Sequence, residues 1–383
     1  MLGWIVAATG VGLAAAALHP FTTYPLSLAL LGRVRPRRAA PAGPLPRSAA
    51  LLVCAYNEAG VIGAKADNML AMRAALPKLD LLAWVDHASD GTAAVLRNKR
   101  GIRVYEAERR RGKTHGMNRL SMATEAEVLV CTDANVTFAP DAVARLLAPF
   151  ADPGVGLVCG HLVYADGPDT AMSGTGNLFW RLEERIKALE DATGGGVTAD
   201  GSIFAVRSAL YRRAPDDIID DMYVSLSVLL EGYRIARAAD ALATEPPVTG
   251  VREEFRRKRR IACQAYNVHR LLAPRLRRLP ALPRYKYFSH KWLRWWSGPF
   301  LLGAAILVPA GVALAGWPAA AAALLAVPVL VGAAGWLRPD GFAGKLVAVA
   351  AAFAATGLGL IESLRGRRYQ TWAPPPSARG ATP

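Results

Sequence analysis

Hydrophobic residues gather at the two ends of the chain, while the middle alternates short apolar runs with polar segments. Residues 2–31 and 299–362 carry most of the hydrophobic excess. A helix that crosses a membrane needs about 20 apolar residues. The N-terminal stretch therefore predicts one membrane-spanning helix, kinked or tilted where His19 and Pro20 interrupt it. The C-terminal stretch predicts further apolar helices at 299–316, 318–337 and 342–361.

Basic residues flank these apolar ends and indicate an orientation. The first apolar stretch is followed, not preceded, by Arg33, Arg35, Arg37 and Arg38. That order is typical of a retained anchor, with the next domain on the cytoplasmic side. Arg365, Arg367 and Arg368 favour the same side for the tail, whereas three full spans would place it outside. A re-entrant or interfacial segment remains an alternative, and aromatic and basic residues over 285–296 predict a helix in the headgroup region.

The middle of the chain predicts an α/β domain with a mainly parallel sheet. Strand-like runs lie at 49–56, 81–86, 102–105, 128–132 and 155–164. Helix-like segments lie between or after them, at 61–76, 92–99, 114–123, 140–150 and 222–230. This alternation implies crossover connections, and ligands of such sheets bind beyond the carboxyl ends of the strands. Asn57, Asp86 and Asp133 fall there.

The composition indicates the charge of the binding partner and the cellular compartment of the central domain. The 383 residues carry a net charge of +16, which favours a polyanionic partner such as phosphate groups or an anionic membrane surface. The chain shows no zinc-finger spacing and no RRM-like signature, so we expect no nucleic-acid partner. No protein partner can be inferred. The four cysteines form no C-x-x-C pair, which predicts reduced thiols and a cytosolic central domain: Cys54, Cys131, Cys159 and Cys263.

Residues after the first two strands are candidates for binding a nucleoside. The first strand ends in Ala55-Tyr56-Asn57-Glu58. Asp86 and Asp90 follow the second strand, and a carboxylate there can accept hydrogen bonds from a nucleobase imide or a ribose hydroxyl. The ligand role is the favoured interpretation for Asp86. For Asp90 a turn or helix cap is the stronger alternative.

Phosphate and metal candidates follow. Lys113 ends a run of basic residues just before a helix, where it can contact phosphate, although a solvated charge run is equally compatible. Asp133-Ala134-Asn135 follows a hydrophobic strand with two oxygen-bearing side chains. Mg²⁺ or Mn²⁺ prefers such ligands, completed by substrate phosphates, and the alternative is an Asx-turn.

Two further charged segments complete the candidate set. Asp220 and Asp221 precede an apolar helical pattern, where acids are ordinary caps but one could serve as a general base. Arg257 and Arg260 share one face of a predicted helix, and guanidinium groups bind diphosphate with two parallel hydrogen bonds. Contact with anionic lipid is the alternative for that basic stretch.

Taken together, these segments resemble the membrane-bound members of glycosyltransferase family 2, from about Tyr24 to Trp372. The family's nucleoside motifs are similar to 55–58 and 86–92, with His87 and Ala88 departing from the pattern. Its G-K followed by L-N looks like Gly112-Lys113 and Met117-Asn118. Its D-x-D metal motif corresponds to residues 133–135, with Asn135 in place of the second acid.

The resemblance extends to the acceptor side. The family's G-x-x-x-A-x-R segment is similar to 201–207, which implies that Gly201 and Ser202 face the acceptor. Its E-D pair resembles Asp220-Asp221 and implies that Asp221 is the catalytic base. Its Q-x-x-R-W motif is replaced by residues 257–261, in which only Arg260 is retained.

The resemblance implies a GT-A fold and an inverting transfer of sugar from a nucleotide diphosphate donor, with UDP-sugar as the expected class and Mg²⁺ or Mn²⁺ as cofactor. The acceptor would be lipid-linked or a polysaccharide beside membrane lipids of a bacterial-type inner membrane. We expect an anchor at 1–32, a catalytic domain at 47–250, basic and interfacial helices at 251–298, membrane segments at 299–362 and a tail at 363–383. The alternatives are a membrane-associated nucleotidyltransferase and a non-catalytic scaffold that binds anionic lipid.

Overall fold

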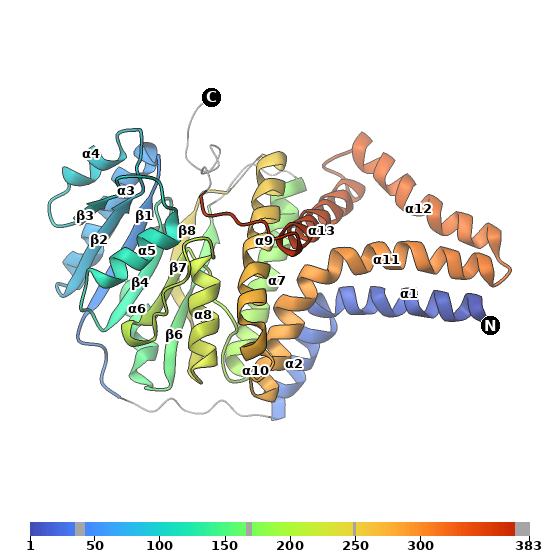
Figure 1. Ribbon diagram of the computed structural model, residues 1–383, viewed down its shortest axis with the longest axis horizontal. Coiled ribbons are helices and arrows are strands. Elements are labelled where there is room, and N and C mark those ends of the chain that lie inside the picture. The colour runs from blue at the N-terminus through green and yellow to red at the C-terminus, as the bar shows by residue number, and fades with distance from the viewer. Residues whose placement is uncertain (35–42, 166–170, 248–249, 372–383) are drawn as a thin grey trace.

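The computed structural model describes residues 1–34, 43–165, 171–247 and 250–371. An α/β domain lies on one side, and the long apolar helices extend from the other side, with α7 and α9 standing between them (Figure 1). The predicted basic residues Arg35, Arg37 and Arg38, together with Trp372, lie outside the described residues.

The domain is built on one mixed sheet with strand order β3-β2-β1-β4-β7-β6-β8-β5. The strands are β1 Ala49–Ala55, β2 Leu79–Val85, β3 Arg103–Glu106, β4 Val128–Asp133, β5 Thr137–Phe138, β6 Val155–Tyr164, β7 Ile203–Arg207 and β8 Arg234–Glu245. The four strands from β3 to β4 pair in parallel, as the alternating pattern predicts. β7 runs antiparallel to both of its neighbours, and β8 pairs in parallel with β6. The carboxyl ends of β1, β2 and β4 therefore share one edge.

Helices cover both faces of this sheet and bury an apolar layer on each. The helices are α1 Leu2–Leu18, α2 Thr23–Val34, α3 Ala59–Ala75, α4 Thr92–Arg97, α5 Lys113–Met122, α6 Ala142–Leu147, α7 Ala171–Ala192, α8 Asp220–Leu230, α9 Val251–Leu276, α10 Ala281–Tyr287, α11 Leu293–Leu314, α12 Pro318–Leu337 and α13 Phe342–Leu364. One core joins α3, α4 and α6 to the sheet through residues such as Ile62 and Leu146. The other joins α5 and α8 through Met117 and Val224. The strand ends are thereby held between two packed layers.

A third core joins the domain to the membrane-type helices. It contains Leu226 of α8, Val268 of α9, Tyr287 of α10 and Leu360 of α13. Four described helical segments are long and apolar enough to cross a membrane: Leu2–Phe21, Ala281–Leu314, Pro318–Leu337 and Phe342–Leu364. A short turn over His19–Phe21 separates α1 from α2, at the interruption that the sequence predicts. The segment 285–296 is helical, as predicted, and runs from α10 through Phe288–Trp292 into α11.

A buried polar cluster also fastens these parts together. Both ring nitrogens of His290 contact carboxylates of α7, with 2.7 Å to Glu190 and 3.1 Å to Glu183. The hydroxyl of Tyr24 donates to Glu190 over 2.6 Å, and Lys291 lies 3.3 Å from Glu183. Buried charges are tolerated when they are paired in this way, so the cluster fixes where α2 and the segment Phe288–Trp292 before α11 meet α7.

The tail of the chain returns to the α/β domain. Asn267 of α9 donates to the Arg367 carbonyl over 2.9 Å, and Gln264 donates to the Tyr369 carbonyl over 2.8 Å. The end of α13 therefore lies on the same side of the apolar helices as the domain. The four cysteines are free thiols, and three of them are buried.

Candidate active site

The ends of β1 and β2 meet through an interlocked pair of turns. The Asn57 side chain accepts a hydrogen bond from the Ser89 backbone N–H over 2.9 Å, and its NH₂ group donates to the Ser89 hydroxyl over 3.2 Å. Asn57 and His87 both adopt left-handed backbone conformations, with φ of 51° and 56°. Such conformations are uncommon for residues other than glycine and gather at functional sites. The family-like motif has Gly where His87 stands, which the positive φ explains.

Asp86 holds the cationic loop that precedes α5. Its two carboxylate oxygens accept hydrogen bonds from the backbone N–H groups of Arg111 at 2.8 Å and Gly112 at 2.7 Å. The Asp86 residue is 3% exposed, so these donors satisfy its carboxylate inside the fold. The guanidinium of Arg110 stacks on Tyr56 at 3.6 Å from the ring centre. The nucleoside candidates of the first two strands and the basic loop thus form one rim.

Asp90 and Glu58 serve the local structure of this rim. One oxygen of Asp90 accepts from the Thr92 backbone at 3.0 Å, and the other accepts from the Ala59 backbone at 3.0 Å. Burial is the largest single influence on the pKa of Asp90 and would raise it, but the hydrogen bonds together outweigh it and lower that pKa. Glu58 is buried at the start of α3, and its backbone N–H donates to Thr92. Ala55 is buried at the end of β1.

Lys113 and Asp133 form the centre of the site. Lys113 is the first residue of α5, after Gly112 with φ of 90°, and its ammonium lies 2.5 Å from Asp133. Burial alone would lower the pKa of Lys113, but the carboxylates of Asp133, Asp220 and Asp221 outweigh it and raise that pKa. A cation surrounded by three acids remains charged and can neutralise a phosphate that enters among them.

The turn at Asp133–Asn135 is held in place by hydrogen bonds from Lys65. Asp133 and Asn135 are partly exposed while Ala134 between them is buried, so both polar side chains face outward. Lys65 of α3 donates to the Thr132 hydroxyl over 3.0 Å and to the Val136 carbonyl over 2.6 Å. Burial lowers the pKa of Lys65 to about 7, against the opposing charge of Asp133. These contacts fix the turn on both sides.

Asp220 and Asp221 begin α8 and enter the same space. A Cβ added to Gly201 would lie 2.8 Å from an Asp221 carboxylate oxygen and 3.4 Å from the Lys113 nitrogen, which places the three residues side by side. Burial and the neighbouring Asp220 charge raise the pKa of Asp221 to about 7. Asp220 is 3% exposed, and its Oδ2 has no hydrogen-bond partner among the described residues. Asp221 is the more accessible acid of the two.

Arg257 and Arg260 of α9 close the site on the membrane side. Burial and the neighbouring Arg257 lower the pKa of Arg260 to about 10, against the attraction of Asp133 and Asp221. Arg257 interacts with Tyr164, Glu254 and Glu245, which raise its pKa although burial opposes them. Asp133 and Asp221 attract Arg260, and Glu245 at the end of β8 attracts Arg257, so both cationic side chains act on the acids at the carboxyl ends of the strands. An anion that entered the site would relieve the repulsion between them.

The donor set fits a divalent cation shared with a ligand. Within the described residues, no three His, Cys, Asp or Glu side chains converge as a metal cage. Asp133 and Asn135 offer one carboxylate and one amide oxygen on the outward face of the turn. Mg²⁺ and Mn²⁺ are commonly held by one or two such groups plus phosphate oxygens, so the residues present suit that arrangement.

Two parts of this site are absent from the expectations drawn from sequence. Glu245, at the end of β8, accepts a hydrogen bond from the Asn135 amide over 3.1 Å. Gln370, in the tail, donates to the Arg111 carbonyl over 3.0 Å, and a Cβ on Gly112 would overlap the Gln370 carbonyl. In the sequence, an acid directly before two prolines is a weak signal for Glu245, and no local pattern marks Gln370 as part of the site.

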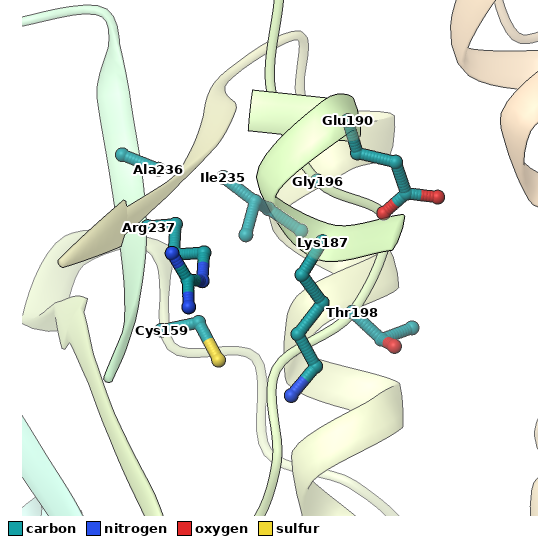
Figure 2. A pocket seen from close by; sticks show the side chains of 8 residues that line it. All are labelled: Cys159, Lys187, Glu190, Gly196, Thr198, Ile235, Ala236 and Arg237. Atoms are coloured by element: carbon teal, nitrogen blue, oxygen red, sulfur yellow. The ribbon is translucent and has the colours of Figure 1, made fainter. Parts of the chain in front are cut away.

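A small cavity lies elsewhere, between α7 and the sheet (Figure 2). Its volume is about 10 Å³, which suits at most about one water molecule. Lys187 comes from α7, whereas Cys159 and Arg237 come from β6 and β8. Lys187 and Arg237 both pair with Glu184, so this region is part of the packing of α7 and not a substrate site.

Comparison with known proteins gives a family match. The model of a family described as glycosyltransferase like family 2 matches residues 46–264. The O-antigen chain rhamnosyltransferase RfbN of Salmonella typhimurium is 25% identical over 223 residues, covering 54% of this chain and 69% of that protein. An N-acetylglucosaminyltransferase of Sinorhizobium fredii is 24% identical over 175 residues, covering 42% of each.

A solved structure matches nearly the whole chain. The mannosyltransferase PcManGT of Pyrobaculum calidifontis, solved in complex with GDP-Man and Mn²⁺, has a TM-score of 0.72 and 23% identity. The match covers 94% of this chain and 99% of that one. The fold similarity therefore includes the apolar helices as well as the α/β domain, which is of the GT-A type.

Proposed function

The chain belongs to the glycosyltransferase like family 2 and is a hexosyltransferase, and from this premise we propose that it transfers sugar from a nucleotide diphosphate donor to a membrane-proximal acceptor. The transfer inverts the anomeric centre, and Asp221 is the general base. The observation that carries the proposal is the meeting of Asp133, Lys113 and Asp221 at the carboxyl ends of the strands.

The proposed reaction is one in-line displacement. Asp221 accepts the proton of the acceptor hydroxyl as its oxygen attacks the anomeric carbon, and the bond to the nucleoside diphosphate breaks on the opposite face. An acid with a pKa of about 7 suits proton transfer near neutral pH. Lys113, Arg257 and Arg260 neutralise the charge that develops on the departing diphosphate.

We assign the nucleoside to the rim formed by 55–58 and Asp86, and the acceptor to the side of Gly201 and Ser202. Asp133 and Asn135 would hold Mg²⁺ or Mn²⁺, which when bound supplies Lewis-acid neutralisation of the diphosphate. UDP-sugars are the first donor class to test, and GDP-mannose is the second, because the matched mannosyltransferase was solved with it and with Mn²⁺.

The proposed location is a bacterial-type inner membrane, with the catalytic domain in the cytosol. The apolar helices and the basic residues near their ends support it. In this arrangement residues 1–32 anchor the enzyme, 47–250 form the catalytic domain, 251–298 cover the site, 299–362 enter the membrane and 363–383 form the tail. A lipid-linked saccharide or a growing polysaccharide is then the acceptor, and membrane lipids surround the helices.

The experiment that tests the proposal measures transfer or donor hydrolysis by the full-length protein across a panel of nucleotide sugars, with Mg²⁺ and with Mn²⁺. We expect release of a nucleoside diphosphate. Asp221→Asn should reduce turnover at least about 100-fold while nucleoside diphosphate binding is retained, because loss of a general base costs that much or more.

Asp217→Asn is the matched control. Asp217 lies in the loop directly before α8, is more exposed than Asp221 and pairs with Arg368 at 3.6 Å, so its replacement should leave turnover within about twofold. Normal turnover by Asp221→Asn would refute the base assignment. Release of pyrophosphate would identify a nucleotidyltransferase, and lipid binding without nucleotide affinity would identify a scaffold.

A further inference from the structure

We propose that Glu245 is a positioning residue that turns the Asn135 amide oxygen outward and joins the cation side of the site to the acceptor side. The inference rests on the proposed function, since it concerns the same donor site. It adds a residue from β8 that no motif in the sequence marks. Asn135 would then act as a cation ligand only through the orientation that Glu245 imposes.

The Glu245 side chain contacts two different segments and feels the charge of a third. The Asn135 side-chain N–H donates to Glu245 Oε1 over 3.1 Å, and the Ser202 hydroxyl lies 3.5 Å from Oε2. The guanidinium of Arg257 interacts with the same carboxylate and with the Tyr164 hydroxyl. One side chain therefore contacts the turn after β4 and the loop before β7, and it lies within the electrostatic reach of Arg257 on α9.

Because Glu245 is buried, its carboxylate needs these partners in place of water. The residue is 8% exposed, and the two buried positions of β8 directly before it are Ala241 and Ala243, which offer no polar side chain. Pro246 and Pro247 follow and offer no N–H donor. A buried carboxylate without hydrogen-bond donors is costly, so Glu245 depends on the donors of Asn135 and Ser202 and on the nearby charge of Arg257.

The chemistry of the two side chains sets the orientation. The Asn135 NH₂ group donates to Glu245 Oε1, and a carboxylate oxygen is the acceptor that such a group requires. The amide oxygen is the other branch of the same group, so it points away from Glu245 and toward the outward face that Asn135 shares with Asp133. With glutamine at position 245 the Asn135 amide loses this constraint. With aspartate at position 135 two carboxylates would face each other.

The test measures binding of UDP and GDP to the full-length protein by calorimetry, with and without Mn²⁺, and Mn²⁺ binding alone by electron paramagnetic resonance. Partners that orient metal ligands contribute about 10- to 100-fold to affinity. We therefore expect Glu245→Gln to weaken Mn²⁺-dependent binding of the nucleoside diphosphate by about a factor of ten, with Mn²⁺-free binding unchanged. Asn135→Asp alone should also weaken it, because its charge would face Glu245.

The double variant Asn135→Asp/Glu245→Gln separates positioning from a loss of folding. The amide introduced at position 245 can donate to the carboxylate introduced at position 135, so binding should return to within about threefold of the wild type. Glu106→Gln, an exposed acid paired with Arg97, is the matched control and should bind as the wild type does. Asp133→Ala should abolish the Mn²⁺ dependence.

The outcomes are distinguishable. If the wild type binds nucleoside diphosphate with Mn²⁺ and Glu245→Gln binds it equally well, the positioning role is wrong while the proposed function stands. A double variant no better than the single variants also overturns the role. If the wild type binds neither UDP nor GDP, the proposed function fails and takes this inference with it.

Discussion

Two adjacent acids at the start of α8 have different surroundings, and this separates their roles. Asp221 is partly exposed beside Lys113, whereas Asp220 is 3% exposed and one of its oxygens has no partner among the described residues. Burial raises the pKa of Asp221, and Asp220 raises it further because two negative charges in one buried space repel each other. Asp220 is thus placed to tune the proposed base, and Asp221 is the acid that an acceptor can reach.

This difference predicts a pH shift in Asp220→Asn. The base works when it is ionised, so kcat/KM of the wild type should rise as pH increases through about 7. Removing the Asp220 charge lowers the pKa of Asp221, so the rising limb of the pH profile should move to lower pH. The profile of kcat/KM, measured from about pH 5 to about pH 9, checks this.

Asp217→Asn again serves as the control, and the rising limb of its pH profile should stay where it is in the wild type. A limb that stays in place or moves to higher pH in Asp220→Asn contradicts the tuning role. Complete loss of turnover at every pH would instead identify Asp220 as the base, so the same measurement decides between the two acids.

Residues that follow strands could be located from the sequence, and residues that act across the fold could not. Asp86 and Asp133 follow apolar runs, and the parallel alternation brings such positions to one edge. Glu245 contacts residues 110 and 43 positions away in the chain. Its local sequence resembles an ordinary strand end, so nothing nearby distinguishes it from a solvated acid.

At the scale of elements, apolar runs predicted the four parallel strands β1 to β4 and also β6. The sequence did not predict β5, β7 and β8. β8 contains arginines, an aspartate and many alanines, which lowers its strand signal. β7 has five residues, and its antiparallel direction follows from the path of the chain through α7. The direction of such a strand depends on where a long connection ends, which local periodicity does not encode.

The packing of α1 on α11 depends on small residues. A Cβ on Gly311 would overlap the Ala7 nitrogen and the Gly3 carbonyl, whereas a Cβ on Gly332 of α12 would meet nothing within 4 Å. Close approach of this kind is typical of helices that associate in membranes. Gly311 and Gly332 therefore form a matched pair for one substitution.

We predict that Gly311→Ala lowers stability and Gly332→Ala does not. The added methyl group at 311 must separate the helices, at a cost of about 1–3 kcal/mol. At 332 alanine favours the helix by about 0.5–1 kcal/mol. Thermal unfolding of both variants in the same detergent checks the prediction, and equal midpoints would mean that α1 and α11 do not pack closely.

At the scale of the molecule, the α/β domain is held against the apolar helices by contacts spread along the chain. The His290 cluster joins α2 and α7 to the segment Phe288–Trp292 before α11, and the segment 367–370 runs from the end of α13 to the cationic loop. The sequence shows that the tail is basic, but it did not decide on which side of the membrane the tail lies. Three full spans after the domain would place the tail outside, whereas its basic residues favour the cytoplasmic side. The contact of Gln370 with Arg111 places the tail beside the cationic loop of the domain, which favours one side for both.

This arrangement predicts the labelling pattern of three single cysteines in sealed membrane vesicles. Arg119→Cys on the domain and Arg365→Cys after α13 should react with an impermeant thiol reagent from the same side, because the tail reaches the domain. Trp317→Cys, at a 62% exposed position in the turn between α11 and α12, should react from the opposite side, because α11 leads away from the domain (Figure 1). Cys54, the one native cysteine that is not fully buried, is replaced by Ser throughout. Reaction of Arg365→Cys together with Trp317→Cys would contradict the shared side, because α13 would then end across the membrane from α9.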